Sequence, residues 1–117
     1  DYVESMWKML NAKKPSDYVI STGKSHTVKN FVEEAFKFIN VKISWRGKGL
    51  KETGFNKKNG ETLVKIDPVY FRPTDIDELR GDSTKAKKEL GWQPKTSLEQ
   101  MVIKMVNNDI KKLKAYH

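Results

Sequence analysis

The sequence predicts an α/β fold in which amphipathic helices alternate with short strands. One observation is the apolar stripe over residues 28–39, whose spacing is that of a helix with one face turned to a core. Another is the alternation of apolar and polar side chains at residues 41–45 and again at 62–66, which is typical of half-buried strands. A third is the helical periodicity of residues 98–110, which predicts a second long helix.

Length and composition point to one soluble domain. A chain of 117 residues is long enough to bury about two-thirds of its unfolded surface. The formal net charge is +8, with lysines spread from Lys8 to Lys114, a distribution that suits solubility better than a binding stripe. No apolar run reaches the ~20 residues of a membrane helix, and we expect neither a signal peptide nor a membrane partner. We therefore expect a cytoplasmic protein.

Several kinds of chemistry are excluded by residue type. The sequence has no cysteine and only two histidines, His26 and His117. Disulfides, thiolate catalysis and Cys- or His-rich metal sites are therefore ruled out.

The first third of the chain predicts a helix, a strand and a second helix. Apolar side chains fall at helical spacing over residues 3–10, and we expect Pro15 to end that helix. No capping residue precedes this pattern, so we expect the chain to be cut at its N-terminus. Residues 18–21 are predicted to form a short buried strand. Thr27 is the expected N-cap of the helix over residues 28–40, which would complete a βα unit.

The two alternating segments are expected to pair as strands, with a mobile loop from Gly47 to Gly60 between them that closes in an Asn59-Gly60 turn. Asp82 or Ser83 is expected to cap a short helix through Leu90, with Gly91 in the left-handed conformation.

The last helix is expected to begin with a capping box formed by Ser97 and Gln100. Its predicted core face comprises Leu98, Met101, Val102, Met105, Val106 and Ile110.

The segment over residues 67–77, Asp-Pro-Val-Tyr-Phe-Arg-Pro-Thr-Asp-Ile-Asp, predicts a phosphate-binding arginine. The guanidinium of Arg72 has a fork of donors that matches two phosphate oxygens, and flanking rings and a proline would restrict it before a ligand arrives. Asp75 could accept hydrogen bonds from a sugar diol. The alternative is a salt bridge from Arg72 to Asp75 or Asp77 that only fixes a loop.

Two glycine-containing motifs fail on spacing. Residues 22–25, Thr-Gly-Lys-Ser, resemble the end of a P-loop, but Tyr18 stands where that loop needs its first glycine. The Gly-x-Gly at residues 47–49 is not a dinucleotide fingerprint, because Glu52 occupies the position of the third glycine. No Tyr-x-x-x-Lys pair occurs. The residues therefore predict no catalytic base.

Six segments taken together resemble one family. They are DYVESMW at 1–7, DYVISTG at 17–23, VKNFVEEAF at 28–36, WRGKGL at 45–50, YFRPT at 70–74, and the stretch from Gly-Asp to Leu-Gly-Trp at 81–92. The family is GDP-mannose 4,6-dehydratase, an extended short-chain dehydrogenase/reductase of the NAD-dependent epimerase/dehydratase type. The likeness covers essentially the whole chain. It implies that residues 1–117 are a single C-terminal substrate-binding fragment, with an NADP-binding Rossmann domain upstream.

The resemblance implies an NADP-dependent lyase that converts GDP-mannose to GDP-4-dehydro-6-deoxy-mannose, a precursor of GDP-fucose. In such an enzyme the cofactor oxidises C4, water leaves across C5 and C6, and the hydride returns to C6. Cofactor and catalytic residues are expected upstream, so this chain alone is expected to be inactive. Arg72 would hold the GDP diphosphate, and Asp75, where the family usually has glutamate, would hold the ribose. The partners implied are GDP-mannose and further copies in a homo-oligomer, with no nucleic acid.

Two other functions remain open from the residues alone. One is a stand-alone basic α/β module that binds RNA or an acidic protein through cations around one loop, namely Arg46, Lys48, Lys51, Lys57 and Lys58. The other is an oligomerisation piece whose first helix packs on a neighbour.

Overall fold

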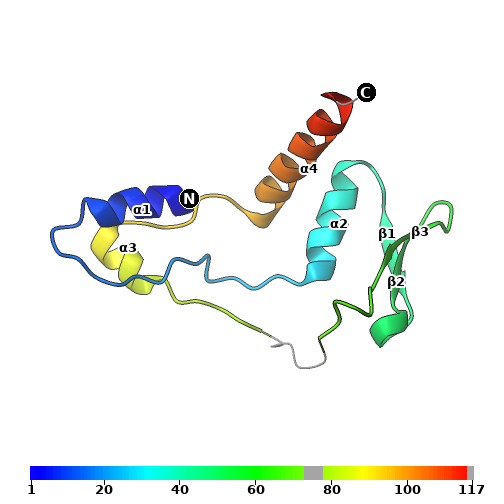
Figure 1. Cartoon of the computed structure of the whole chain (residues 1–117), viewed down its shortest axis with the longest axis horizontal. Helices are drawn as coiled ribbons and strands as arrows, with labels where there is room; N and C mark the ends of the chain where they lie inside the picture. The colour runs from blue at the N-terminus through cyan, green and yellow to red at the C-terminus, as the bar shows by residue number, and fades with distance from the viewer. Residues whose placement is uncertain (73–77, 116–117) are drawn as a thin grey trace. The chain divides into compact units, whose positions relative to one another are not determined.

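The computed structural model describes residues 1–72 and 78–115, and it confirms the prediction of a mixed α/β chain with short strands. Figure 1 shows the elements in chain order. They are α1 (Tyr2–Leu10), α2 (Val28–Phe38), β1 (Ile43–Arg46), the short 3-10 helix η1 (Gly49–Lys51), β2 (Thr53–Asn56), β3 (Thr62–Lys65), α3 (Thr84–Leu90) and α4 (Leu98–Ala115).

The chain divides into two compact units. The first comprises Asp1–His26 and Asp77–Leu98, and the second comprises Thr27–Ile76 and Glu99–His117. Helices α1 and α3 belong to the first unit, whereas α2, the sheet and nearly all of α4 belong to the second. That the whole chain acts as one substrate-binding fragment stays a prediction.

The sheet of the second unit has three strands in the order β1-β2-β3, with both pairs antiparallel. We predicted direct pairing of the outer two strands, which is wrong, because β2 lies between them (Figure 1). Trp45 of β1 faces Gly54 of β2, which in turn faces Val64 of β3. The predicted mobile loop therefore contains the central strand.

Gly54 explains why β2 escaped prediction. A glycine interrupts the apolar alternation that marks a strand, and its usual meaning there is close approach of a neighbour. Gly54 is buried, and a Cβ atom built on it would lie 3.0 Å from Cζ3 of Trp45 and 3.1 Å from Cβ of Val64. The ring of Trp45 fills the space that a side chain would take.

The Asn59-Gly60 turn is confirmed as the connection from β2 to β3. Gly60 has a φ of +75°, and its amide donates to the carbonyl of Asn56 at 2.8 Å. The amide of Asn56 donates to the carbonyl of Glu61, also at 2.8 Å. Glycine is favoured here because a positive φ carries no steric cost without a Cβ.

Helix α2 begins where the sequence predicted. The hydroxyl of Thr27 accepts from the amide of Asn30 at 3.0 Å, which satisfies one of the free donors of the first turn. The helix contacts β1 through Trp45, whose indole N–H donates to Glu33 at 2.8 Å. Lys29 lies 5.4 Å from the centroid of the same ring and forms an ion pair with Glu52 at 2.5 Å.

The helix predicted at the start of the first unit is confirmed as α1, but it ends before Pro15. Asn11 stands at the C-cap, and its side-chain amide donates to the carbonyl of Trp7 at 2.7 Å. This side-chain bond satisfies a carbonyl that the next helical turn would otherwise have used.

Helix α3 also follows the prediction at both ends. Ser83 is the N-cap but makes no side-chain capping bond, whereas the carboxylate of Asp82 accepts from the amide and the hydroxyl of Thr84 at 2.9 and 2.6 Å. Gly91 ends the helix in the left-handed conformation with φ +60°. Helix α4 begins directly after Ser97.

The strand predicted at residues 18–21 is wrong, and so is the βα unit built on it. No strand is assigned among the described residues of the first unit. A strand needs a neighbour that accepts its backbone hydrogen bonds, and the sheet belongs to the second unit. Tyr18 is held by its side chain instead, since its hydroxyl donates to Glu89 at 3.0 Å. Val19 is 54% exposed.

The described residues bury few apolar side chains completely. The buried apolar residues are Ile43, Ala86, Trp92 and Val102. Val102 confirms one position of the predicted α4 core face, but Met101 and Met105 are exposed. Helix α1 buries Ser5 and exposes most of its apolar side chains, among them Trp7 at 64% and Leu10 at 86%.

Replacing Gly54 with alanine is expected to destabilise the second unit by about 1–3 kcal/mol, since the new methyl group would overpack the ring of Trp45. Gly60 is the comparison, because it is also a glycine but nothing lies within 4 Å of a Cβ built on it. Asparagine tolerates positive φ, so Gly60→Asn is expected to cost less than Gly54→Ala. Urea unfolding of the two variants measures the difference. Equal costs would contradict the packing argument.

Candidate functional site

Arg72 lies in exposed chain that follows a turn after β3. The carboxylate of Asp67 accepts from the amide of Val69 at 2.9 Å, and the amide of Tyr70 donates to the carbonyl of Asp67 at 3.2 Å. These bonds shape the backbone just before the arginine. Asp67 thus forms an Asx-turn, which accounts for an aspartate at the start of this segment.

The guanidinium of Arg72 is free of partners within residues 1–72 and 78–115. Arg72 is exposed, and no hydrogen bond or ion pair to it is formed by these residues. Tyr70 is 80% exposed and Phe71 44% exposed. The rings that stack on cations in the described chain are Trp45, Phe55 and Tyr18, which serve Lys29, Arg46 and Lys85.

Asp75, the second predicted site residue, lies outside the described residues, as does Asp77 of the alternative salt bridge. The pairing of Arg72 with Asp75 in a sugar-nucleotide site therefore stays a prediction. Four cavities lined by described residues do not include Arg72 in their walls.

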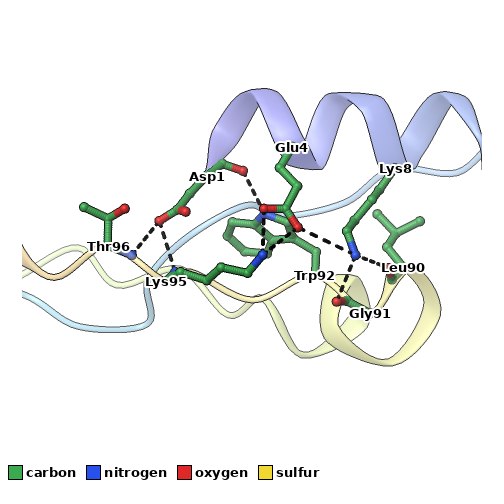
Figure 2. Close-up of polar contacts among 8 residues, drawn as sticks. All are labelled: Asp1, Glu4, Lys8, Leu90, Gly91, Trp92, Lys95 and Thr96. Atoms are coloured by element: carbon green, nitrogen blue, oxygen red, sulfur yellow. Dashed lines mark hydrogen bonds and ion pairs between the residues drawn. The ribbon is translucent and has the colours of Figure 1, made fainter.

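Polar contacts hold the two sequence segments of the first unit together, since they join the start of α1 to the residues after α3. Figure 2 shows Asp1 at the start of α1 beside the segment that follows α3. The carboxylate of Asp1 accepts from the amides of Lys95 and Thr96 at 3.1 and 2.9 Å, and its backbone carbonyl accepts from the indole of Trp92 at 2.8 Å. Trp92 is fully buried. The contacts fix the chain that leads into α4.

Two lysines extend the same network (Figure 2). Lys95 donates to both carboxylate oxygens of Glu4 at 3.1 and 3.0 Å. Lys8 donates to the carbonyls of Leu90 and Gly91 at 3.3 and 3.2 Å, where the last turn of α3 leaves acceptors without intrahelical partners. None of these groups is placed for catalysis, and their arrangement is structural.

The surroundings shift the pKa values of three side chains in the first unit. The hydrogen bond from Lys95 holds the pKa of Glu4 below its ordinary value. The bonds from Thr84 likewise lower the pKa of Asp82. Desolvation, followed by the bond to Glu89, raises the pKa of Tyr18.

Sequence reasoning missed a cavity of about 470 Å³ in the first unit, lined by Arg80 and Lys87 among others. Gly23 also lines this cavity, and no local sequence pattern predicts that residue 23 lies near residues 80–87. The described residues contain no cluster of His, Cys, Asp or Glu able to hold a metal ion. No helix of the described chain is long and apolar enough to cross a membrane.

The described residues form a mixed α/β chain, and Arg72 is its candidate anion-binding residue. Over residues 1–105 the chain matches the family model described as GDP-mannose 4,6 dehydratase. The chain belongs to this family.

Individual relatives carry the same name. The GDP-mannose 4,6 dehydratase of Drosophila melanogaster is 51% identical over 94% of this chain, and that of Dictyostelium discoideum is 52% identical over 97%. The human protein is 46% identical over 94%. The chain spans 28%, 32% and 30% of the lengths of these three relatives.

The Glu4–Lys95 bond predicts a loss of stability in acid. A carboxyl with a lowered pKa stabilises the folded state above its unfolded pKa, near 4.5 for Glu4, and this contribution disappears as the pH falls through the folded value. Glu4→Gln is therefore expected to flatten the dependence of the unfolding midpoint on pH below about 4.5. Denaturant unfolding of the first unit at several pH values measures it.

The control for this experiment is Glu78→Gln, which removes the same charge from an exposed side chain with no hydrogen bond or ion pair among the described residues. Its curve is expected to keep the slope of the unmodified chain. If Glu4→Gln kept that slope as well, the Lys95 contact would not be the source of the acid sensitivity.

Trp92→Ala is expected to cost about 3–5 kcal/mol, because it empties the largest buried site of the first unit. Trp92→Phe keeps a ring and loses the bond to Asp1, so it is expected to cost about 1 kcal/mol beyond any change in packing. Trp7→Ala serves as control, since Trp7 is 64% exposed. Urea unfolding followed by circular dichroism compares the three variants, and a Trp7 cost equal to that of Trp92 would contradict the assignment.

Proposed function

We propose that this chain supplies the GDP-sugar-binding part of an NADP-dependent GDP-mannose 4,6-dehydratase, a lyase that converts GDP-mannose to GDP-4-dehydro-6-deoxy-mannose. The observation that carries the proposal is identity of about half of all positions over almost the whole chain to proteins with this name. Local features of the described residues agree with a binding role.

Arg72 is the proposed diphosphate ligand. Its side chain is exposed, and none of residues 1–72 and 78–115 would have to release it before it binds a phosphate. The Asp67 turn orders the backbone two to five residues before it, which limits the entropy lost on binding. Asp75 is the proposed ribose ligand.

The described residues do not fit a dinucleotide. Gly47 and Gly49 lead from β1 into the 3-10 helix η1, whereas a dinucleotide fingerprint joins a strand to a full helix that points at the pyrophosphate. We therefore propose that NADP and the catalytic residues are bound and supplied by parts of the enzyme other than this chain, and that the chain alone is inactive. We further propose that the whole enzyme is a homo-oligomer.

A chimeric enzyme tests the proposal directly. In it, this chain replaces the matching third of the Dictyostelium discoideum relative, which is 52% identical over 114 residues. We expect the chimera to convert GDP-mannose when NADP is supplied, and the isolated chain to show no turnover. Mass spectrometry of the sugar nucleotide detects the loss of water. A folded chimera that binds NADP and leaves GDP-mannose unchanged would refute the proposed function.

Arg72→Ala in the chimera is expected to weaken GDP-mannose binding by one to two orders of magnitude, because a charge-assisted hydrogen bond contributes about 1.5–3 kcal/mol. Calorimetric titration with GDP-mannose measures the dissociation constant. Lys58→Ala, which removes a charge from the turn between β2 and β3, is the matched control and is expected to bind normally. Unchanged affinity in a folded Arg72→Ala chimera would exclude the role.

The identity of the acid at position 75 is expected to tune ribose recognition. Asp75→Asn removes the charge of the acceptor and is expected to weaken binding of GDP-mannose several-fold, whereas Asp75→Glu restores the reach of the residue usual in the family and is expected to preserve or strengthen it. Comparing GDP with 2′,3′-dideoxy-GDP assigns the effect to the diol. Equal losses for both nucleotides would show that Asp75 does not contact the ribose.

A further inference from the structure

The turn between β2 and β3 contains a pair of residues that is prone to spontaneous deamidation. Of the seven asparagines of the chain, Asn59 alone is followed by glycine. Asparagine is a thermally labile residue, because the backbone nitrogen of the next residue can attack its side-chain carbon. A side chain on that next residue obstructs the attack, and glycine has none. Asn59, Gly60 and Glu61 are all exposed, so water reaches the reacting atoms.

The reaction at this pair needs only water as co-reactant. The backbone nitrogen of Gly60 loses its proton to solvent and bonds to Cγ of Asn59, while the side-chain nitrogen takes up a proton and leaves as ammonia. Water then opens the resulting five-membered succinimide. Cleavage between the Gly60 nitrogen and Cγ gives aspartate, and cleavage between the same nitrogen and the main-chain carbonyl carbon gives isoaspartate. The net change is a water consumed and an ammonia released, so no oxidant or reductant takes part.

The folded turn holds both reacting groups in hydrogen bonds. The amide of Gly60, which carries the attacking nitrogen, donates to the carbonyl of Asn56 at 2.8 Å. The side-chain oxygen of Asn59 accepts from the amide of Glu61 at 3.1 Å, and its side-chain nitrogen donates to the Glu61 carboxylate at 3.3 Å. Because the Gly60 nitrogen must give up its proton and approach Cγ of Asn59, the turn has to open before the ring can close.

Contacts outside the reacting pair hold this turn closed. The side-chain oxygen of Asn56 accepts from the amide of Lys58 at 2.9 Å. The amide of Asn56 donates to the carbonyl of Glu61, and the amide of Lys57 donates to the carbonyl of Lys42, both at 2.8 Å. Exposed turns open locally at a lower free energy than the sheet unfolds. The stability of the turn therefore controls how often the pair can react.

We propose that Asn59 is a site of spontaneous deamidation and that the hydrogen bonds of the β2–β3 turn slow the reaction in the folded chain. The proposal does not depend on the proposed function. The isoaspartate product has an extra methylene group in its backbone, which does not fit a turn closed by the bond from Asn56 to Glu61. The aspartate product keeps the backbone length but places a second carboxylate beside that of Glu61.

Incubation of the 117-residue chain in warm, mildly alkaline buffer tests the proposal, with and without urea. Trypsin releases the peptide Asn59–Lys65, and mass spectrometry with labelling by an isoaspartyl methyltransferase counts its aspartate and isoaspartate forms. A short peptide of residues 57–62, incubated in both buffers, corrects for the effect of urea on the chemistry. Asn59→Gln is the negative control, because its longer side chain would have to close a six-membered ring.

We expect product at Asn59 in both states, formed several-fold more slowly in the folded chain than in urea. No product at Asn59 in the folded chain would overturn the proposed site. A corrected rate in the folded chain that equals or exceeds the rate in urea would overturn the protective role of the turn.

Asn56→Ala separates the effect of the turn from that of the reacting pair. It removes the side-chain bond to the amide of Lys58 and leaves the reacting residues unchanged. We expect deamidation in the folded chain to become about twofold to tenfold faster, which is the factor that a lost hydrogen bond corresponds to. The rate in urea is expected to stay the same. Asn56→Asp keeps the acceptor and is expected to keep the slow rate.

The matched control is Lys57→Ala, which truncates an exposed side chain of the same turn and keeps its backbone bond to Lys42. Circular dichroism establishes that each variant is folded, and each folded rate is divided by the rate of the same variant in urea. If Asn56→Ala and Lys57→Ala gave the same ratio, the turn would not control the reaction and the proposal would fail.

Discussion

Burial of Trp92 is the interaction on which the first unit depends. Its indole is fully buried and donates to the backbone of Asp1, so residues separated by 91 positions are joined at one point. The unit has few other completely buried side chains, and α1 exposes its apolar face. Polar contacts by Asp1, Lys95 and Lys8 lie around the tryptophan and join α1 to the end of α3 and the segment after it. One buried ring and the polar contacts around it therefore hold the two sequence segments of the first unit together.

The second unit has a comparable centre in Trp45, which joins α2 to the sheet. Its indole bonds to Glu33, its face lies under Lys29, and its edge occupies the space above Gly54. A side chain at position 54 would displace the ring. The residue that looks weakest as a strand former is thus the one that permits the sheet and the helix to pack together.

Local signals were sufficient to predict most helices and turns. The Thr27 cap, the Asp82 start, the left-handed Gly91 and the Asn59-Gly60 turn each depend on residues close in sequence, and each is confirmed. Strands depend on pairing with other strands, and a local sequence pattern does not show which segment will be the partner. Residues 18–21 had the composition of a strand but pair with no strand of the described residues, whereas β2 has strand partners on both sides and a glycine that interrupts its apolar pattern. The cavity before α3 was missed for the same reason, since it joins Gly23 to residues distant in sequence.

The arginines of this chain differ in whether their side chains contact other described residues. The chain has three arginines, at positions 46, 72 and 80. Arg46 serves the sheet, because it donates to Thr62 at 3.1 Å and lies 5.0 Å from the centroid of Phe55. Arg72 and Arg80 have no such partner among the described residues, although a guanidinium offers more directed donors than a lysine does. Such donors gain most from a planar pair of oxygens, which is what a phosphate presents. Arg72, which the sequence predicts to bind a phosphate, is thus one of two arginines whose side-chain donors no described residue uses.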